Sequence, residues 1–271
     1  MKKLDILIAV LITLFWGGNF VAAKISIQEV PSFLSIAIRF LITGLILLPF
    51  IKKSKVSFKT LYYSAIVFGV FFVGFIYYSL YLGLSGSLAS ILMQLNIPFS
   101  IIIARVILKE KFTFNSLFGM MIAFIGTFII INIHDYSAGS LSLVIILLAA
   151  FFNAVFNLQT RQLTELPILS LLCWNSLIAA PHLFILSYFL EGNSVSLLQN
   201  STYLFWCSIS YTIIFTGILG VSGWMYLLQK YSIYKVISFN SLVPLFGSLL
   251  SIMIFSEPVS WHLLLGGALT I

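Results

Sequence analysis

The sequence contains very little charge, and this scarcity excludes ordinary soluble proteins. Only 8% of the 271 residues are Asp, Glu, Lys or Arg, while 61% are hydrophobic. A soluble globular domain carries about 25% charged residues. The net charge of +7 arises from basic residues in short breaks between long apolar runs. That pattern is typical of charge that sets membrane topology, so we expect no nucleic-acid partner.

The residue patterns that enzymes and ion-driven pumps use are also missing. No Asp or Glu lies in the middle of an apolar run, which removes the commonest relay for protons or sodium ions. The sequence has no phosphate-binding glycine loop with a lysine, no carboxylate pair, no nucleophile elbow and no His/Cys metal cluster. We therefore expect a protein that is not an enzyme and needs neither cofactor nor metal.

What the sequence does have is a series of long apolar runs. A run of about 20 apolar residues crosses a bilayer as one helix. The sequence therefore predicts an all-α integral membrane protein with ten transmembrane helices. They are expected at residues 4–23, 32–51, 61–82, 86–108, 112–132, 141–161, 169–189, 202–228, 234–255 and 259–271. The last would be only about 20 Å long, so we expect it to be short or incomplete. A cleaved signal peptide is the alternative for the first run.

The distribution of basic residues predicts the orientation. With the amino terminus in the cytoplasm, nearly all loop Lys and Arg residues fall on the cytoplasmic side, and Lys24 falls outside. We expect a multi-pass protein of the bacterial cytoplasmic (inner) membrane with both termini in the cytoplasm. Its expected partners are the lipid bilayer and a small-molecule substrate, and a homodimer is left open.

Two distant segments resemble each other. In each, a proline near the start of an apolar helix leads to a glutamate at its far end. These residues are Pro98 and Glu110 within residues 94–119, and Pro244 and Glu257 within residues 240–266. The expected topology places the glutamates on opposite membrane faces, so the segments would run in opposite directions.

An inverted repeat of this kind is a signature of secondary transporters, whose binding site lies near the membrane midplane where the halves meet. We therefore expect one five-helix repeat over residues 1–135 and a second, inverted one over residues 136–271. The prolines and glutamates would then be gating or structural elements of the repeat.

Several further stretches form a recognisable set of motifs: Trp16-Gly17-Gly18-Asn19-Phe20 with Lys24, Pro31, Arg39-Phe40, the repeated proline-glutamate-glycine pattern, and Leu92-Met93-Gln94-Leu95-Asn96. With these motifs the sequence resembles a known family, the EamA branch of the drug/metabolite transporter superfamily. The resemblance implies a ten-helix carrier of two inverted five-helix repeats, related to amino-acid and metabolite exporters. Pro258 departs from it, because the family usually has a basic residue beside that glutamate.

Arg39 is the cation placed well inside an apolar run. Charge within a membrane is costly and usually faces a cavity or a partner. The guanidinium could receive a substrate carboxylate or phosphate through two hydrogen bonds. The alternative is a structural arginine that extends toward the membrane surface or binds carbonyls at a helix end.

Amides and aromatic residues within the runs are further candidates. Buried amides bind either another helix or a ligand, and aromatic rings either wall a cavity or face lipid. The candidates for substrate contact are Trp16, Asn19, Tyr78, Gln94, Asn96, Asn153, Asn157 and Trp224. Gly17 and Gly18 would permit close helix approach or bending at a gate. His182 is either a proton carrier or a packed neutral side chain.

Together these features predict a secondary transporter that moves small polar metabolites, in the first place amino acids or their derivatives, outward by alternating access. Without an embedded carboxylate we expect facilitated diffusion or exchange and no tight proton coupling. Two alternatives stay open: an importer or exchanger of S-adenosylmethionine or another nucleotide-like metabolite, and a non-transporting scaffold or channel.

Overall fold

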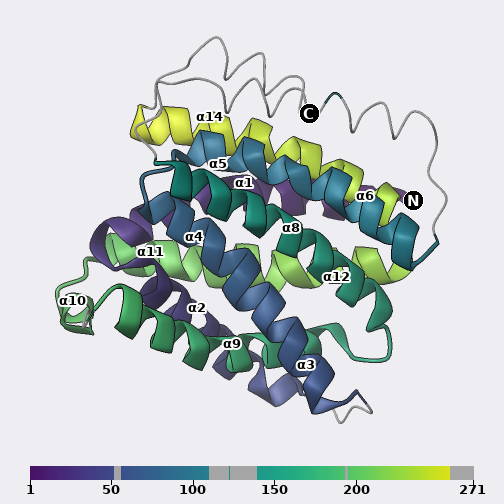
Figure 1. Ribbon diagram of the computed structural model, residues 1–271, viewed down its shortest axis with the longest axis horizontal. Coiled ribbons are helices and arrows are strands. Elements are labelled where there is room, and N and C mark those ends of the chain that lie inside the picture. The colour runs from purple at the N-terminus through teal and green to yellow at the C-terminus, as the bar shows by residue number, and fades with distance from the viewer. Residues whose placement is uncertain (52–55, 110–121, 123–138, 193–194, 257–271) are drawn as a thin grey trace.

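The computed structural model is a bundle of long helices that lie side by side (Figure 1). It describes residues 1–51, 56–109, 122, 139–192 and 195–256. Within these residues all regular structure is helical, which confirms the all-α prediction. Two predicted helices, at 112–132 and 259–271, lie essentially outside the described residues. Glu110 and Glu257 lie outside them too.

Eight described segments are long and apolar enough to cross a membrane, and all eight coincide with predicted runs. Four of them are continuous helices. These are α1 (Lys3–Glu29), α2 (Ser32–Leu47, extended by the 3-10 turn η1, Leu48–Phe50), α8 (Ser140–Gln162) and α9 (Ile168–Leu190). All eight spans could be predicted because the length of an apolar run is the strongest signal that a membrane helix leaves in a sequence.

The other four segments are composite helices with an irregular middle. Two contain a π-helical stretch: α3 (Phe58–Ala65), η2 (Ile66–Gly74) and α4 (Phe75–Tyr81); and α11 (Tyr203–Tyr211), η4 (Thr212–Val221) and α12 (Ser222–Lys230). Two contain a 3-10 stretch: α5 (Gly86–Leu92), η3 (Met93–Leu95) and α6 (Asn96–Ile107); and α13 (Ile233–Ile237), η5 (Ser238–Leu242) and α14 (Val243–Phe255). The π and 3-10 stretches therefore come in the same order in both parts of the chain.

The two 3-10 stretches have a cause in the sequence. Pro98 and Pro244 each follow a 3-10 stretch closely. A proline has no N–H to donate to the carbonyl four residues before it, and its ring crowds that carbonyl. The turn ahead of each proline therefore departs from α-helical geometry.

Two boundaries differ from the sequence prediction. The first helix continues through Lys24 to Glu29, and the Lys24 ammonium lies over the Phe255 ring, 4.5 Å from its centroid. A short helix, α10 (Val195–Gln199), occupies part of the expected polar connection at 190–201.

Helix α1 packs against α14, α11, η4 and α12, whereas α2 packs mainly against α9. Glycine permits the close approach of α1 to its neighbours. A Cβ on Gly17 would overlap Phe246 of α14, and a Cβ on Gly18 would overlap the Tyr211 hydroxyl of α11. Small residues at helix contacts are a main means of packing helices in a membrane.

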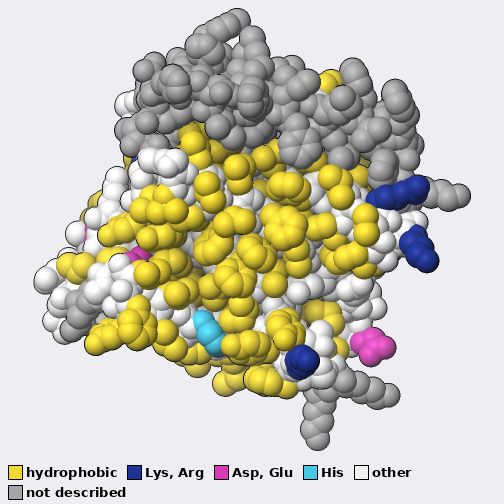
Figure 2. Space-filling model, viewed as in Figure 1, with side chains coloured by type: hydrophobic (Ala, Val, Ile, Leu, Met, Phe, Trp, Pro, Cys, Tyr) yellow, Lys and Arg dark blue, Asp and Glu magenta, His cyan; other side chains and the backbone are white. Residues whose placement is uncertain are grey.

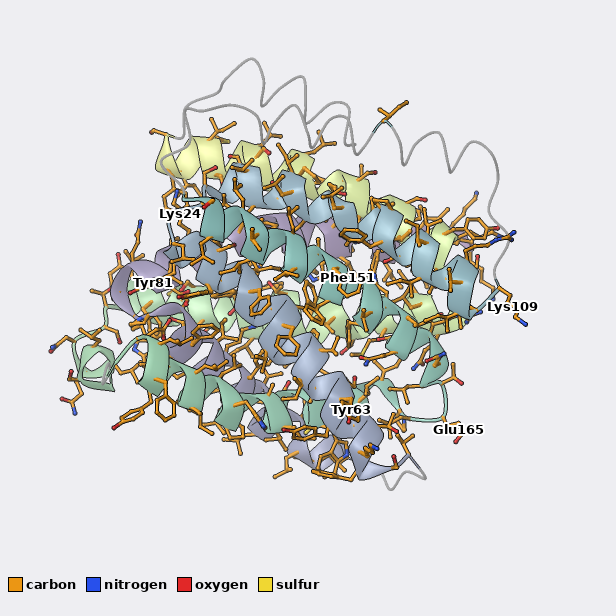
Figure 3. All side chains as sticks on the ribbon, in the orientation of Figure 1. Lys24, Tyr63, Tyr81, Lys109, Phe151 and Glu165 are labelled. Carbon is orange, nitrogen blue, oxygen red and sulfur yellow. The ribbon has the colours of Figure 1, made fainter. Side chains whose placement is uncertain are left out.

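The described part of the bundle has an apolar face and polar ends (Figure 2, Figure 3). Apolar side chains cover the face shown in Figure 2, and charged groups lie near its edges. In Figure 3, Lys24 and Tyr81 lie at one end, Lys109 and Glu165 lie at the other, and Phe151 lies between them. This distribution is the one expected of helices that cross a bilayer.

Polar contacts join distant segments at both ends of the bundle. At the end where α1 begins, the Lys230 ammonium is 3.0 Å from Asp5 Oδ2, and the Tyr231 hydroxyl donates to the same oxygen at 2.6 Å. Where α1 ends, Glu29 accepts from the Thr202 backbone N–H and hydroxyl, both at 2.6 Å. Nearby, Glu191 accepts from the Ser32 hydroxyl at 2.6 Å, at the start of α2.

Candidate functional site

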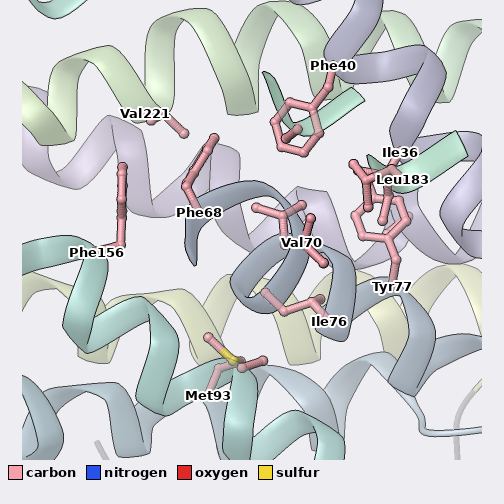
Figure 4. Packing of buried hydrophobic residues seen from close by; sticks show 14 of the residues in the cluster. Ile36, Phe40, Phe68, Val70, Ile76, Tyr77, Met93, Phe156, Leu183 and Val221 are labelled. Atoms are coloured by element: carbon pink, nitrogen blue, oxygen red, sulfur yellow. The ribbon is translucent and has the colours of Figure 1, made fainter. Parts of the chain in front are cut away.

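A buried cavity of about 80 Å³ lies in the interior of the bundle and is lined by both continuous and composite helices. Figure 4 shows four of its apolar lining residues, Phe68, Ile76, Met93 and Val221, which come from three of the composite segments. The full lining is Trp16, Asn19, Phe20, Arg39, Phe68, Phe72, Val73, Ile76, Met93, Gln94, Asn96, Asn153, Thr216, Val221, Asn240 and Val243. Nine of these sixteen residues are apolar or aromatic, and the other seven are amides, a threonine and an arginine.

The cavity is formed where the helices are least regular. The two π stretches supply Phe68, Phe72, Thr216 and Val221, while η3 and η5 supply further lining residues. In π and 3-10 stretches the side chains point in directions that a straight α-helix would not give them. Such stretches occur often at functional sites.

Arg39 is the one charged side chain among the cavity residues that the structure describes. It is 3% exposed and donates from Nη1 to the Tyr77 hydroxyl at 3.3 Å. Its Cζ lies 5.7 Å from the centroid of the Phe40 ring. No described carboxylate lies within ion-pair distance of the guanidinium. The structure therefore buries the Arg39 guanidinium inside the bundle, and substrate contact by this side chain stays a prediction.

Six of the predicted substrate-contact residues line this one cavity: Trp16, Asn19, Arg39, Gln94, Asn96 and Asn153. They come from α1, α2, η3, α6 and α8. The Trp16 indole donates to the Thr216 carbonyl at 3.4 Å. The gathering of these residues from distant parts of the chain supports the prediction of a cavity wall, while substrate contact itself stays a prediction.

Three predicted residues lie elsewhere. Asn157 is fully buried, donates to Ser100 Oγ at 3.1 Å and accepts from Trp224 Nε1 at 3.1 Å. Tyr78 stacks on Phe33, with ring centroids 4.9 Å apart. The structure thus gives Asn157 and Trp224 a contact with each other, between helices α8 and α12, in place of a position on the cavity wall.

His182 also lies outside the cavity, and both of its ring nitrogens have partners. Nδ1 is 2.8 Å from the Ile178 carbonyl, which can only accept, so Nδ1 carries a proton. Nε2 is 2.9 Å from the Tyr62 hydroxyl, which can donate to it. A neutral imidazole satisfies both contacts.

Two polar cavity residues were not among the sequence predictions. Asn240 lies four residues before Pro244, as Gln94 lies four residues before Pro98, so the repeat contained the signal for it. Thr216 lies within an apolar run and no sequence pattern distinguishes it from other threonines. Within the described residues, no group of three His, Cys, Asp or Glu side chains lies together as a metal ion would require.

Comparison with known families identifies the chain. The model of the EamA-like transporter family matches it twice, over residues 3–132 and 140–271. The chain belongs to the EamA-like transporter family. This confirms the resemblance seen in the sequence, and the protein is a multi-pass membrane protein of a transporter family.

Individual relatives agree over nearly the whole length. The chain is 27% identical over 282 residues to a Salmonella typhimurium protein described as a probable amino-acid metabolite efflux pump, a match that covers 99% of this chain and 93% of that protein. An Escherichia coli protein with the same description is 25% identical with the same coverage. An uncharacterized transporter of Bacillus subtilis is 29% identical over 291 residues, covering 100% of this chain and 92% of the relative.

The fold is also found in a solved structure. A protein of known crystal structure superposes with a TM-score of 0.75 at 14% sequence identity. The match covers 100% of this chain and 94% of that one. At this identity the likeness concerns the fold alone.

Proposed function

We propose that this EamA-like transporter is a secondary carrier for small metabolites that have an anionic group, and that Arg39 binds that group. The observation that carries the proposal is a buried guanidinium on the cavity wall with a neutral hydrogen-bond partner and no described carboxylate nearby. A buried cation without a counter-charge is costly. A carboxylate ligand would supply that charge through two parallel hydrogen bonds.

The rest of the wall favours a compact ligand with an apolar part. Phenylalanine, valine, isoleucine and methionine side chains make up half of the lining. The cavity volume of about 80 Å³ is well below the roughly 300–1,000 Å³ of sites for drug-sized ligands. The size therefore favours an amino acid or a close derivative over an adenosyl compound.

We propose outward transport by alternating access between two inverted five-helix repeats, residues 1–135 and 136–271. The order of π and 3-10 stretches in the two parts of the chain supports the repeat. The inversion is supported by two corresponding helices that run in opposite directions. The Tyr203–Lys230 helix ends beside Asp5, whereas the Phe58–Tyr81 helix ends on the side of Lys24 (Figure 3). Outward direction and an inner-membrane location with cytoplasmic termini rest on the bacterial relatives described as efflux pumps and on the loop charges.

The contacts at the two ends of the bundle fit this mechanism. Access from one side would require the Asp5–Lys230 contact to open, and access from the other would require the Glu29–Thr202 contact to open. Each contact joins the start or end of α1 to a segment of the second part of the chain. Breaking them in turn would let the halves rock about the cavity.

Counterflow in proteoliposomes tests the proposal. Liposomes preloaded with unlabelled L-leucine are expected to take up labelled L-leucine transiently above equilibrium, because a carrier exchanges substrate across the membrane. Arg39→Met is expected to reduce this uptake at least tenfold. Arg39→Lys is expected to be intermediate, because an ammonium keeps the charge but cannot make the paired hydrogen bonds.

The matched control is Arg105→Met, which removes an exposed arginine near the end of α6 and should leave counterflow unchanged. Folded protein is measured for each variant by size-exclusion chromatography. Full activity in Arg39→Met would contradict the role of Arg39. Exchange of adenosyl compounds but not leucine would contradict the substrate class. Flux without exchange acceleration would indicate a channel, and no flux with any substrate would indicate a scaffold.

A further inference from the structure

The cavity wall contains acceptor atoms that have no partner. Asn19 Oδ1, Gln94 Oε1, Asn240 Oδ1 and Thr216 Oγ are all buried, and none makes a hydrogen bond within the part of the chain that the structure describes. Their residues are between 2% and 8% exposed and all line the cavity. Buried polar groups in native proteins are nearly always paired, so a cluster of unpaired ones calls for a ligand or ordered water.

The orientation of two of these amides is fixed by backbone carbonyls, which can only accept. Asn96 Nδ2 donates to the Met93 carbonyl, so Asn96 Oδ1 faces the other way and accepts from Asn240 Nδ2 at 3.1 Å. This leaves the oxygen of Asn240 unpaired. A reversed Asn96 amide would place its oxygen against the Met93 carbonyl oxygen.

Gln94 is fixed in the same way. Its Nε2 donates to the Ser90 carbonyl at 3.4 Å, which leaves Oε1 as the unpaired atom. Gln94 and Asn240 each lie four residues before a proline, one in each part of the chain. The unpaired oxygens therefore come from matching positions relative to the two prolines, and both belong to residues that line the same cavity.

We infer that the amide oxygens of Asn19, Gln94 and Asn240 form a binding site for the α-ammonium group of the substrate. The inference rests on the proposed function, in which Arg39 binds the carboxylate of the same molecule. An ammonium has three N–H donors and no acceptor, so it can satisfy three amide oxygens at once. A hydroxyl in its place has one proton to donate and leaves acceptors unpaired.

The charge of the cavity sets a second requirement. The described lining contains Arg39 and no carboxylate, so an amine without its own anionic group would add a second positive charge next to the first. Like charges in a buried site repel strongly because the surroundings screen them little. The site therefore selects zwitterions and rejects both the corresponding amine and the corresponding hydroxy acid.

A series of three ligands of matched shape tests this selection. L-leucine, 2-hydroxy-4-methylpentanoate and 3-methylbutylamine share one apolar side chain and differ in their charged groups. Each is tested as an inhibitor of labelled leucine counterflow in wild-type proteoliposomes. We expect half-inhibition by the hydroxy acid at a concentration at least tenfold higher than that of leucine, and no inhibition by the amine at that concentration.

Two substitutions at one position separate binding from folding. Gln94→Leu is expected to raise the half-saturating concentration of leucine about tenfold and to leave that of the hydroxy acid unchanged, so the discrimination between the two falls. Gln94→Glu places a carboxylate in the cavity to balance Arg39, and the amine is expected to become an inhibitor. If Gln94 has only a structural role, Gln94→Leu will keep the preference for leucine over the hydroxy acid, and the amine will not inhibit Gln94→Glu.

The matched control is Asn175→Leu. Asn175 is a fully buried amide whose side-chain atoms are also unpaired among the described residues, but it does not line the cavity. This variant should retain the wild-type order of inhibitors. If the hydroxy acid competes as well as leucine while Arg39→Met abolishes uptake of both, the ammonium site is wrong and the carrier proposal stands. If wild-type protein exchanges no leucine, the ammonium site and the proposed substrate class are both wrong.

Discussion

Two groups of buried amides in this bundle differ in whether their oxygen atoms have hydrogen-bond partners. Asn157 has both ends of its amide paired, to Ser100 and Trp224, whereas Gln94 and Asn240 each keep an unpaired oxygen on the cavity wall. Burial is similar in the two groups, at 0%, 2% and 3% exposure respectively. In the proposed function, the paired amide holds helices together and the unpaired oxygens bind the substrate.

The largest expected effect on stability is that of Asn157→Leu. The substitution leaves Trp224 Nε1 and Ser100 Oγ buried without their present partner. An unsatisfied buried group costs about 1–3 kcal/mol, so we expect a loss of about 2–4 kcal/mol in the free energy of unfolding, measured by denaturant titration in micelles. Leucine counterflow per folded molecule should change little. If Asn157→Leu kept its stability but lost transport, the roles assigned to the paired and the unpaired amides would be reversed.

Trp224→Phe tests the same contact from the other helix, with a smaller effect. The variant removes the donor and leaves Asn157 Oδ1 unpaired, while an aromatic ring remains next to Trp16, whose own ring centroid is 4.9 Å away. We expect a loss of about 1–3 kcal/mol by the same titration. In the double variant with Asn157→Leu the two losses should not add, because they remove one hydrogen bond.

His182→Phe is expected to cost about 1–2 kcal/mol, because it removes two hydrogen bonds, to Tyr62 and to the Ile178 carbonyl, each with a typical net value of about 0.5–1.5 kcal/mol. Leucine uptake should drive no proton movement in wild-type protein, as a pH-sensitive dye inside the liposomes would report. Substrate-dependent proton movement that vanishes in His182→Phe would overturn the proposal of uncoupled exchange.

Gln94→Leu is expected to have the smallest effect on stability, a change within about 1 kcal/mol. It removes the 3.4 Å bond to the Ser90 carbonyl, and it also removes an oxygen that has no partner; these effects oppose each other. The measurement is denaturant titration beside Asn157→Leu. A destabilisation as large as that of Asn157→Leu would mean that Gln94 also holds helices together, and it would contradict the different roles given to the two amides.

Much of the fold could be predicted from the sequence because membrane helices are encoded locally. The eight described spans follow from apolar length, and the 3-10 stretches before Pro98 and Pro244 follow from the missing N–H of proline. The π stretches of η2 and η4 could not be predicted, because no residue type demands them. The count of ten helices stays a prediction.

The site could be predicted only as a set of residue types. Sequence reasoning found Arg39 and Gln94 on chemical grounds, but the same grounds chose Asn157 and Trp224. What separates them is the partner of each amide, and those partners lie far away in the chain: Trp224 is 67 residues from Asn157, and Asn240 is 144 residues from Asn96. Pairing at such distances depends on how the helices pack.

Trp16 connects the cavity to the Asn157–Trp224 contact, because it lines the cavity and its ring packs against that of Trp224. The emission of an indole shifts in wavelength when water or a charged group enters or leaves its surroundings. Trp16 is therefore a built-in optical reporter of whether the cavity is filled. The change in fluorescence on adding leucine that disappears in Trp16→Phe gives the occupancy directly, in detergent and without any transport.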